Sequence, residues 1–299
     1  MQFGLCLPNF PFGVQPSPDA LLGVAQAADR SGFHSIWATD HILVPHDKPR
    51  YGLIYEAFTT LAYLGARTER VRLGTSILVI GLRDAILVAK QTATIDALTG
   101  GRMLLGMGAG YMEGEFQNLG ADFKRRGKHF DEAVQVMRAL WTQESPAFDG
   151  QFYRFKDTLF GPKPAQAGGI PIYIGGNSDH ALQRAAALGD STHFDDFTAD
   201  QVREARDKLR QLTQANGRHV ALSVRRTVDL RPALAISQGK TPPQAGAGAL
   251  AGSMDEVRAA LAAYADAGLD HFICQFEHTN QEEHLAQIEL FARAIIAGH

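Results

Sequence analysis

The sequence predicts an α/β fold, a closed (β/α)8 TIM barrel, and two observations lead to that prediction. Short apolar runs alternate with helical patterns along the 299 residues, with eight of each kind. The apolar runs have no polar face, as is typical of parallel strands covered by helices. An open doubly wound sheet more often has about five to seven strands, so we expect one barrel domain over residues 1–299.

The expected strands and helices repeat one supersecondary unit. The apolar positions from Phe130 to Trp141 have the i, i+3, i+4, i+7 spacing of a helix packed on a sheet. Side chains that cap free amides mark the helix starts, and glycines mark the stops. The expected caps are Ser17, Thr198 and Ser253, the expected C′ glycines are Gly32, Gly189 and Gly268, and the expected strands cover residues 2–7, 35–39, 71–77, 102–107, 171–175, 190–194, 220–228 and 270–276.

The longest expected loops follow strands and are insertions at the C-terminal face, where barrels form their active sites. They cover residues 40–54, 108–127 and 229–252. The last is rich in proline and glycine, and we expect it to be a lid or partly disordered. Residues 145–169 follow a helix and are expected toward the opposite face, with a hairpin that turns at Asp149-Gly150.

Composition narrows the functional class. Lys and Arg number 29 against 32 Asp and Glu, and the resulting net charge of −3 argues against nucleic acid as a partner. Cys6 and Cys274 lie in apolar runs, as buried free thiols do in reducing cytosol. No apolar run reaches 18 residues and no basic segment precedes the first strand, so neither a membrane span nor a standard export signal is expected. We expect a cytoplasmic protein that binds a small molecule.

Two strand ends carry residues with recognisable chemistry. Asp40 and His41 end the second expected strand, where a histidine can exchange a proton and an aspartate can orient it or bind a polar ring. A cap at the strand end is the alternative interpretation. Gly175, Gly176, Asn177 and Ser178 precede an expected helix, and free amides at a helix start beside a serine hydroxyl suit one phosphate. An ordinary capped turn is the alternative there.

Three other segments are less specific. Gly106, Gly108 and Gly110 lack the spacing of a dinucleotide fingerprint, so their absent side chains either admit a flat ring or serve packing. Ser76 and Ile77 end the third expected strand as part of an apolar wall with hydroxyls. The basic run 124–128 is either a solvated surface or a contact for an anionic tail.

Several common barrel and hydrolase chemistries lack their motifs. The first strand ends at Pro8-Asn9 without paired histidines, and no H-E-x-x-H or G-x-S-x-G motif occurs. We therefore predict no metal site and expect organic cofactor chemistry instead.

The segments described above resemble the bacterial luciferase-like monooxygenase superfamily, particularly its coenzyme F-420-dependent oxidoreductase branch. The resemblance runs nearly from end to end. It is carried by Leu7-Pro8-Asn9, Asp40-His41, the strand end at 73–77, the segment 90–102, Phe123 to Trp141, and the turn at 174–178.

The resemblance implies a cofactor ring over the barrel mouth and a cis peptide at Ser76-Ile77 that backs it. Asp40 would bind the ring edge, His41 would act as acid or base, and residues 175–178 would hold the ribityl phosphate. Gly108, Gly110 and His193 would line the ring or phosphate side. The resemblance also implies a homodimer.

The resemblance leaves three functions open. The first is hydride transfer between coenzyme F-420, a deazaflavin, and a small organic substrate under the 229–252 loop. The second is an FMN-dependent monooxygenase that uses oxygen, and the third is a non-catalytic flavin-binding barrel. Tyr111 stands where related sugar-phosphate dehydrogenases have a glutamate acid, which argues against sugar-phosphate oxidation.

Overall fold

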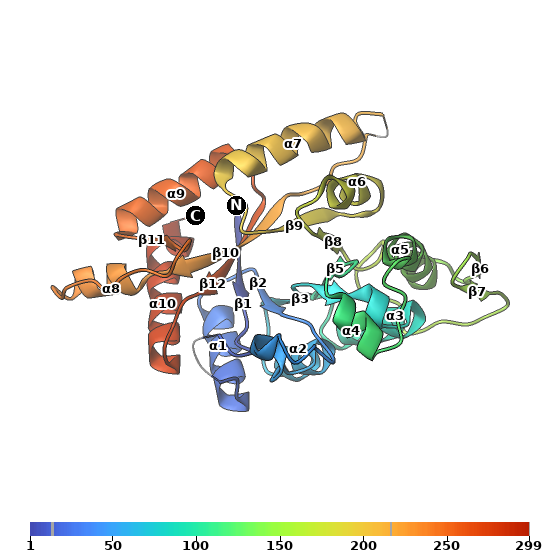
Figure 1. Cartoon of the computed structure of the whole chain (residues 1–299), viewed down its shortest axis with the longest axis horizontal. Helices are drawn as coiled ribbons and strands as arrows, with labels where there is room; N and C mark the ends of the chain where they lie inside the picture. Colours follow the sequence, from blue (N-terminus) through green and yellow to red (C-terminus); the bar gives the residue numbers. More distant parts are fainter. Residues whose placement is uncertain (13–14, 216, 299) are drawn as a thin grey trace.

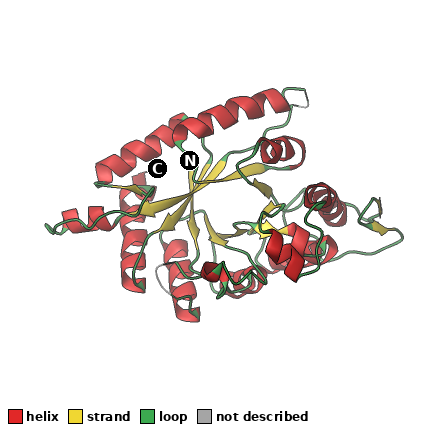
Figure 2. Ribbon diagram, in the orientation of Figure 1, coloured by secondary structure: helices red, strands yellow, loops and turns green. Residues whose placement is uncertain are grey.

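Parallel strands at the centre of the molecule are surrounded by helices (Figures 1 and 2). The computed structural model describes residues 1–12, 15–215 and 217–298. Its strands are β1 (Gln2–Cys6), β2 (Ser35–Ala38), β3 (Arg72–Thr75), β4 (Leu78–Val79), β5 (Met103–Gly108), β6 (Phe148–Asp149), β7 (Arg154–Phe155), β8 (Ile172–Gly175), β9 (Ser191–Asp195), β10 (Ser223–Asp229), β11 (Leu250–Ala251) and β12 (His271–Phe276).

Helices connect these strands and cover them from outside (Figure 1). They are α1 (Pro18–Arg30), α2 (Ala57–Gly65), α3 (Ala85–Leu98), α4 (Glu113–Asn118), α5 (Arg126–Thr142), α6 (Asp179–Leu188), α7 (Ala199–Thr213), α8 (Arg231–Ser237), α9 (Met254–Asp266) and α10 (Gln281–Ala294), with 3-10 turns η1 (Pro49–Tyr51), η2 (Ile80–Leu82) and η3 (Ile296–Gly298).

The barrel closes because the first and last strands pair. The parallel ring runs β1-β2-β3-β5-β8-β9-β10-β12 and returns to β1, with Leu5 opposite Cys274 at the closure. Each of the eight predicted strand regions contains one strand of this ring, so the (β/α)8 prediction is confirmed. In a parallel ring all strands end on one rim, which gathers the segments that follow them.

The third strand is interrupted where the family resemblance placed a cis peptide. β3 ends at Thr75, the Ser76-Ile77 peptide is cis as expected, and β4 then pairs with β5. The facing strand needs a glycine here, because a Cβ at Gly106 would overlap the carbonyl oxygen of Thr75. Gly106 therefore serves packing and does not serve a ligand.

Helix ends follow the sequence signals with one exception. Ser17 caps α1, and Thr198 and Ser253 form capping boxes. Gly32 and Gly268 have φ of +80° and +82°. The interpretation of Gly189 as a C′ glycine is wrong, since its φ is −87°; a Cβ there would lie 2.5 Å from a side-chain carbon of Ile174.

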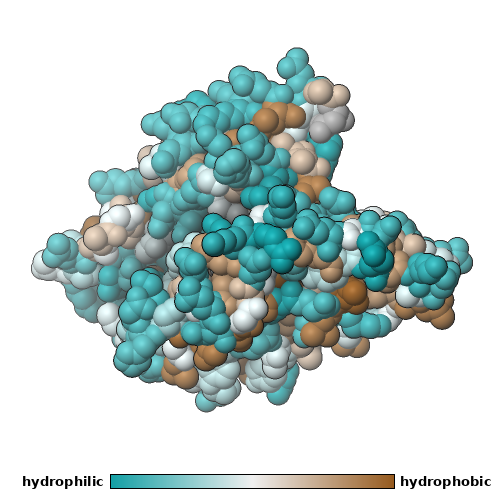
Figure 3. Space-filling view, turned by 45° about the vertical axis from the view of Figure 1, so that its right-hand side comes forward, coloured by the Kyte–Doolittle hydropathy of each residue, from teal (hydrophilic) through white to brown (hydrophobic). Residues whose placement is uncertain are grey.

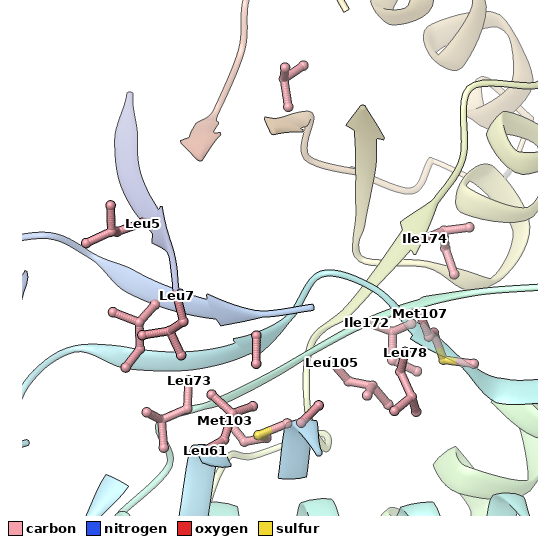
Figure 4. Packing of buried hydrophobic residues seen from close by; sticks show 14 of the residues in the cluster. Leu5, Leu7, Leu61, Leu73, Leu78, Met103, Leu105, Met107, Ile172 and Ile174 are labelled. Carbon is pink, nitrogen blue, oxygen red and sulfur yellow. The ribbon is translucent and has the colours of Figure 1, made fainter. Parts of the chain in front are cut away.

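Alternate strand residues face two different cores. Leu5, Leu73, Met103, Leu105 and Ile172 pack outward against helices (Figure 4). Strand residues at the alternate positions point into the barrel. Five of them form a separate inner core that fills the barrel below the rim: Cys6, Trp37, Leu104, Tyr173 and Ile273. Cys6 and Cys274 are buried and free, as predicted, and lie in the inner and outer cores respectively.

Hydrogen bonds also fix the floor of the barrel. The indole of Trp37 donates to Ser35 Oγ over 2.7 Å, and Ser35 Oγ lies 3.0 Å from His271 Nε2. The packed floor leaves room for a ligand only above it, toward the rim where the strands end.

The insertions lie outside the ring. The predicted hairpin forms as β6 and β7, with Asp149 opposite Arg154. Glu132 of α5 accepts hydrogen bonds from the backbone N–H groups of Gln151, Phe152 and Tyr153 and so fixes the turn of this hairpin.

Across residues 1–12, 15–215 and 217–298, no helix is long and apolar enough to cross a membrane. The face in Figure 3 is mostly hydrophilic, with apolar residues interspersed.

We expect Gly106→Ala to lower the free energy of unfolding by about 1–3 kcal/mol, because the new methyl group overlaps backbone that cannot swing away. Urea denaturation measures this loss. Gly23→Ala in α1 is the control, since its Cβ meets only the end of the flexible Gln281 side chain. Equal stability of Gly106→Ala and the wild type would contradict this account of the interrupted strand.

Candidate active site

A cavity of about 750 Å³ opens at the rim where the strands end. Every site residue predicted from the sequence lines it, although the predictions came from five separate strand ends. These residues are Asp40, His41, Ser76, Ile77, Gly108, Gly110, Gly175, Gly176, Asn177, Ser178 and His193.

His41 is held by a buried carboxylate that the sequence analysis did not identify. Its Nδ1 lies 2.8 Å from Glu115 Oε2, and Glu115 Oε1 accepts the backbone N–H of Ile42 over 2.7 Å. Glu115 is 1% exposed. Burial alone raises the pKa of Glu115, but the bonds from His41 and Ile42 bring this pKa below its ordinary value. An ionised Glu115 only accepts, so His41 donates from Nδ1 and keeps Nε2 for a ligand.

Asp40 already has partners for both carboxylate oxygens. Arg83 binds them through two contacts of 2.7 Å, and the backbone N–H of Val79 adds a third bond of 3.1 Å. Burial raises the pKa of Asp40 above its ordinary value, although the Arg83 charge opposes this. The carboxylate thus fixes β4 beside β2. Its expected bond to a ring edge stays a prediction.

Ser76 and His193 meet at the inner end of the cavity. Ser76 Oγ lies 2.9 Å from His193 Nε2, and His193 Nδ1 lies 3.3 Å from Ser223 Oγ. Burial, together with the neighbouring charge of Arg225, lowers the pKa of His193 to about 3. The imidazole is therefore neutral at physiological pH.

Gly108 and Gly175 are explained by the side chain of Ile77. A Cβ at either glycine would overlap Cδ1 of Ile77, which lies between β5 and β8. Gly110 has φ +88° and packs against Val79 and Phe116. For Gly108 and Gly110 the packing interpretation has direct support, and both glycines, like Gly175, still border the cavity.

The turn before α6 forms the other end of the cavity. Ser178 caps the helix by accepting the N–H of Ala181 over 3.2 Å, which leaves its hydroxyl proton free to donate. Gly176 adopts φ +127°, and its N–H already binds the carbonyl of His193. Asn177 binds both backbone groups of Asp195. The Gly176 amide is thus already used, whereas the free amides at the start of α6 can bind an anion.

Cations surround this end of the cavity. Lys124, Arg126 and Arg184 line it beside the first turn of α5. The basic run therefore borders the cavity as well as solvent, and its contact with an anionic tail stays a prediction. Arg126 also ties the insertion together by donating to the carbonyls of Gly110 and Phe123 over 3.0 and 2.9 Å. Arg184 is already paired with Asp131 over 2.6 Å. A phosphate fits the remaining donor set of a serine hydroxyl, helix amides, Lys124 and Arg126.

Asp195, Arg225, Tyr51 and Tyr111 bring further polar groups to the cavity. Arg225 donates two bonds to Asp195 Oδ1, of 3.0 and 2.8 Å, and has a longer contact of 3.4 Å with the carbonyl of Ser76. Tyr51 packs on His41 with ring centroids 4.3 Å apart. Partial burial, Tyr51 and Glu115 each raise the pKa of Tyr111, which makes its phenol a weaker acid than an ordinary tyrosine.

No residue of the segment 229–252 is among those that line this cavity, and its role as a cover over the substrate stays a prediction. Asp229 explains its position. This buried carboxylate accepts two side-chain bonds from Arg231, of 2.8 and 2.7 Å, and the N–H of Gly246 over 3.1 Å. These bonds hold α8 and the following loop beside β10, at the edge of the molecule (Figure 1).

Within residues 1–12, 15–215 and 217–298, no three His, Cys, Asp or Glu side chains cluster as metal ligands.

The family model described as luciferase-like monooxygenase matches residues 1–245. The chain belongs to this family. It is 30% identical over 232 residues to the FMNH2-dependent dimethylsulfone monooxygenase of Pseudomonas putida, which covers 74% of this chain and 63% of that protein. It is 35% identical over 181 residues to the F-420-dependent glucose-6-phosphate dehydrogenase of Nocardia farcinica, which covers 59% and 53% respectively.

The chain thus spans between half and two thirds of these curated relatives. Among solved structures, monooxygenase RslO1 from Streptomyces bottropensis matches with a TM-score of 0.84 at 23% identity, covering 100% of this chain and 99% of that one. This match shows the fold. The curated relatives named above depend on FMNH2 in one case and on F-420 in the other.

We expect the stability cost of Glu115→Gln to depend on pH. Because the pKa of Glu115 is lowered in the folded state, the carboxylate stabilises the fold above the unfolded value near 4.5. That contribution is lost as the pH falls through the folded value. The difference in unfolding free energy between wild type and Glu115→Gln should therefore shrink between about pH 5 and pH 3.

Urea denaturation at several pH values measures this difference. Glu113→Gln, an exposed position on the same helix, is the matched control and should show a small difference that is independent of pH. A cost of Glu115→Gln that stays constant down to pH 3 would contradict an ionised Glu115 as the acceptor for His41.

Proposed function

We propose that this protein transfers hydride between coenzyme F-420 and a small organic substrate in the rim cavity. The observation that carries the proposal is one cavity with two distinct ends. His41, oriented by Glu115, lies on one side, and the capped start of α6 with its cations lies on another. A ligand with a flat redox ring and a phosphate fits both.

The chain's own contribution to the chemistry is a positioned base. A bound deazaflavin supplies the ring carbon that takes or gives hydride. When an alcohol carbon loses hydride, its hydroxyl proton must also leave, and Nε2 of His41 accepts it. Glu115 stabilises the imidazolium that forms, and in the reverse direction the same nitrogen returns the proton. Tyr51 packs on the imidazole and limits the access of water to it.

The cationic end supports the deazaflavin over FMN. Arg184 is paired with Asp131, but no ion pair is found for Lys124 or Arg126 in the described residues, and the exposed Lys128 continues their charge outward. Coenzyme F-420 carries further carboxylates beyond its phosphate, whereas FMN ends there. The basic segment therefore suits the longer anionic tail better.

An FMN-dependent monooxygenase that uses oxygen is the second candidate. The relative from Pseudomonas putida, which has an FMNH2-dependent activity, covers 74% of this chain and favours it. The same cavity would hold its ring and its phosphate. The homodimer and the cytoplasmic location expected from the sequence stay predictions for either candidate.

We expect His41→Ala to lower turnover about 10²-fold or more while the cofactor still binds, because the variant loses its general base and keeps the phosphate end. Reduction of bound cofactor by a panel of small alcohols, followed by absorbance, measures the rate. His46→Ala, an exposed histidine in the same loop, is the control. Turnover of His41→Ala within threefold of wild type would rule out the assigned base.

We expect coenzyme F-420 to bind more tightly than FMN in titrations of purified protein. Lys124→Ala should weaken F-420 binding several-fold and FMN binding less, since F-420 has carboxylates in addition to the phosphate that both cofactors share. Lys128→Ala, which does not line the cavity, should have a smaller effect. Tight retention of FMN without binding of the deazaflavin would replace the first candidate by the second.

A further inference from the structure

A chain of hydrogen bonds at the inner end of the cavity has a defined direction. Ser223 Oγ lies 2.5 Å from the carbonyl oxygen of Thr192, which can only accept, so Ser223 donates its single proton there. Ser223 Oγ also lies 3.3 Å from Nδ1 of His193. With the serine proton already used, Nδ1 must be the donor in this contact. The neutral imidazole therefore carries its proton on Nδ1.

That assignment determines the role of Ser76. His193 Nε2 has no proton in this tautomer, and Ser76 Oγ lies 2.9 Å from it, so the Ser76 hydroxyl donates to Nε2. His193 is 4% exposed and lies near the Arg225 guanidinium, two conditions that keep it neutral. Toward the cavity, Ser76 Oγ consequently presents lone pairs alone and acts as a hydrogen-bond acceptor.

The surroundings leave this acceptor for a ligand. Ser76 lies at the interruption between β3 and β4 and lines the cavity beside Ile77. The neighbouring hydroxyl of Thr75 is turned away, because it donates to the carbonyl of Gly106 over 2.7 Å. The carboxylate of Asp40 is already bound by Arg83. A ligand with an N–H or O–H group beside Ser76 could donate a hydrogen bond to Ser76 Oγ.

We propose that Ser76 accepts a hydrogen bond from a ring N–H of the bound flavin or deazaflavin and thereby favours the reduced ring. Two-electron reduction adds N–H groups to a flavin, and it adds one to a deazaflavin whose ring carbon takes the hydride. An acceptor fixed in this direction binds the form with more N–H donors better. This inference rests on the proposed function but holds for either cofactor.

The first test compares the affinities of the oxidised and reduced cofactor under anaerobic conditions, with coenzyme F-420 and FMN as probes. In Ser76→Ala the preference for the reduced form should fall about three- to tenfold, the effect of one hydrogen bond. The midpoint potential of the bound cofactor should become more negative by about 14 to 30 mV for a two-electron couple. A residue that only supports the fold would weaken both forms equally.

Ser191→Ala is the matched control. Ser191 is a buried serine of β9 whose Oγ donates to the same Thr192 carbonyl over 2.9 Å, yet it lies outside the chain that ends at Ser76. Its removal should leave the ratio of the two affinities unchanged. A shift in Ser191→Ala as large as that in Ser76→Ala would overturn the proposal.

The second test needs no cofactor. Nitrogen-15 NMR of the imidazole should show His193 as the neutral Nδ1–H tautomer at pH 7. Ser223→Ala removes the acceptor for Nδ1, so His193 should change to the Nε2–H tautomer and the preference for the reduced cofactor should fall as in Ser76→Ala. An Nε2–H tautomer in the wild type, or an unchanged preference in Ser76→Ala, overturns this inference alone. Failure of both cofactors to bind the wild type overturns the proposed function with it.

Discussion

Pairing of the first strand with the last is the constraint on which the candidate site depends. β1 pairs with β2 on one side and with β12 on the other, and this closes the parallel ring. Closure brings the ends of β2, β3, β5, β8 and β9 to one rim, although these ends are spread over about 150 residues of sequence. The packed floor around Trp37 keeps the lower barrel closed, so that a ligand finds space only where these ends converge.

Charge pairing divides the cavity into regions with different chemistry. Near His41 the polar groups that line the cavity have partners: Glu115 binds His41, Arg83 binds Asp40, and Asp195 binds Arg225. In the part of the chain that the structure describes, neither Lys124 nor Arg126 forms an ion pair. The unbalanced positive charge therefore lies by the starts of α5 and α6. An anionic ligand is oriented by this difference before any contact with His41 is made.

The sequence alone located the strands and most of the cavity, because both depend on local patterns. Apolar runs give the strands, and residues that directly follow a strand, such as His41 and Ser178, must lie on the rim. The partners of these residues come from distant segments and leave no local signal. Glu115 lies two positions from the exposed Glu113, and only tertiary packing makes it the support of His41. The position of the 229–252 segment depends in the same way on Asp229.

The most direct measurement is a crystal structure of the protein soaked with coenzyme F-420. The account predicts a ring beside His41 and Ser76, with its phosphate at Ser178 and the first turn of α6. A cofactor bound elsewhere, or one whose phosphate lies away from α6, would contradict the central claim that this cavity binds a redox ring through an anionic anchor.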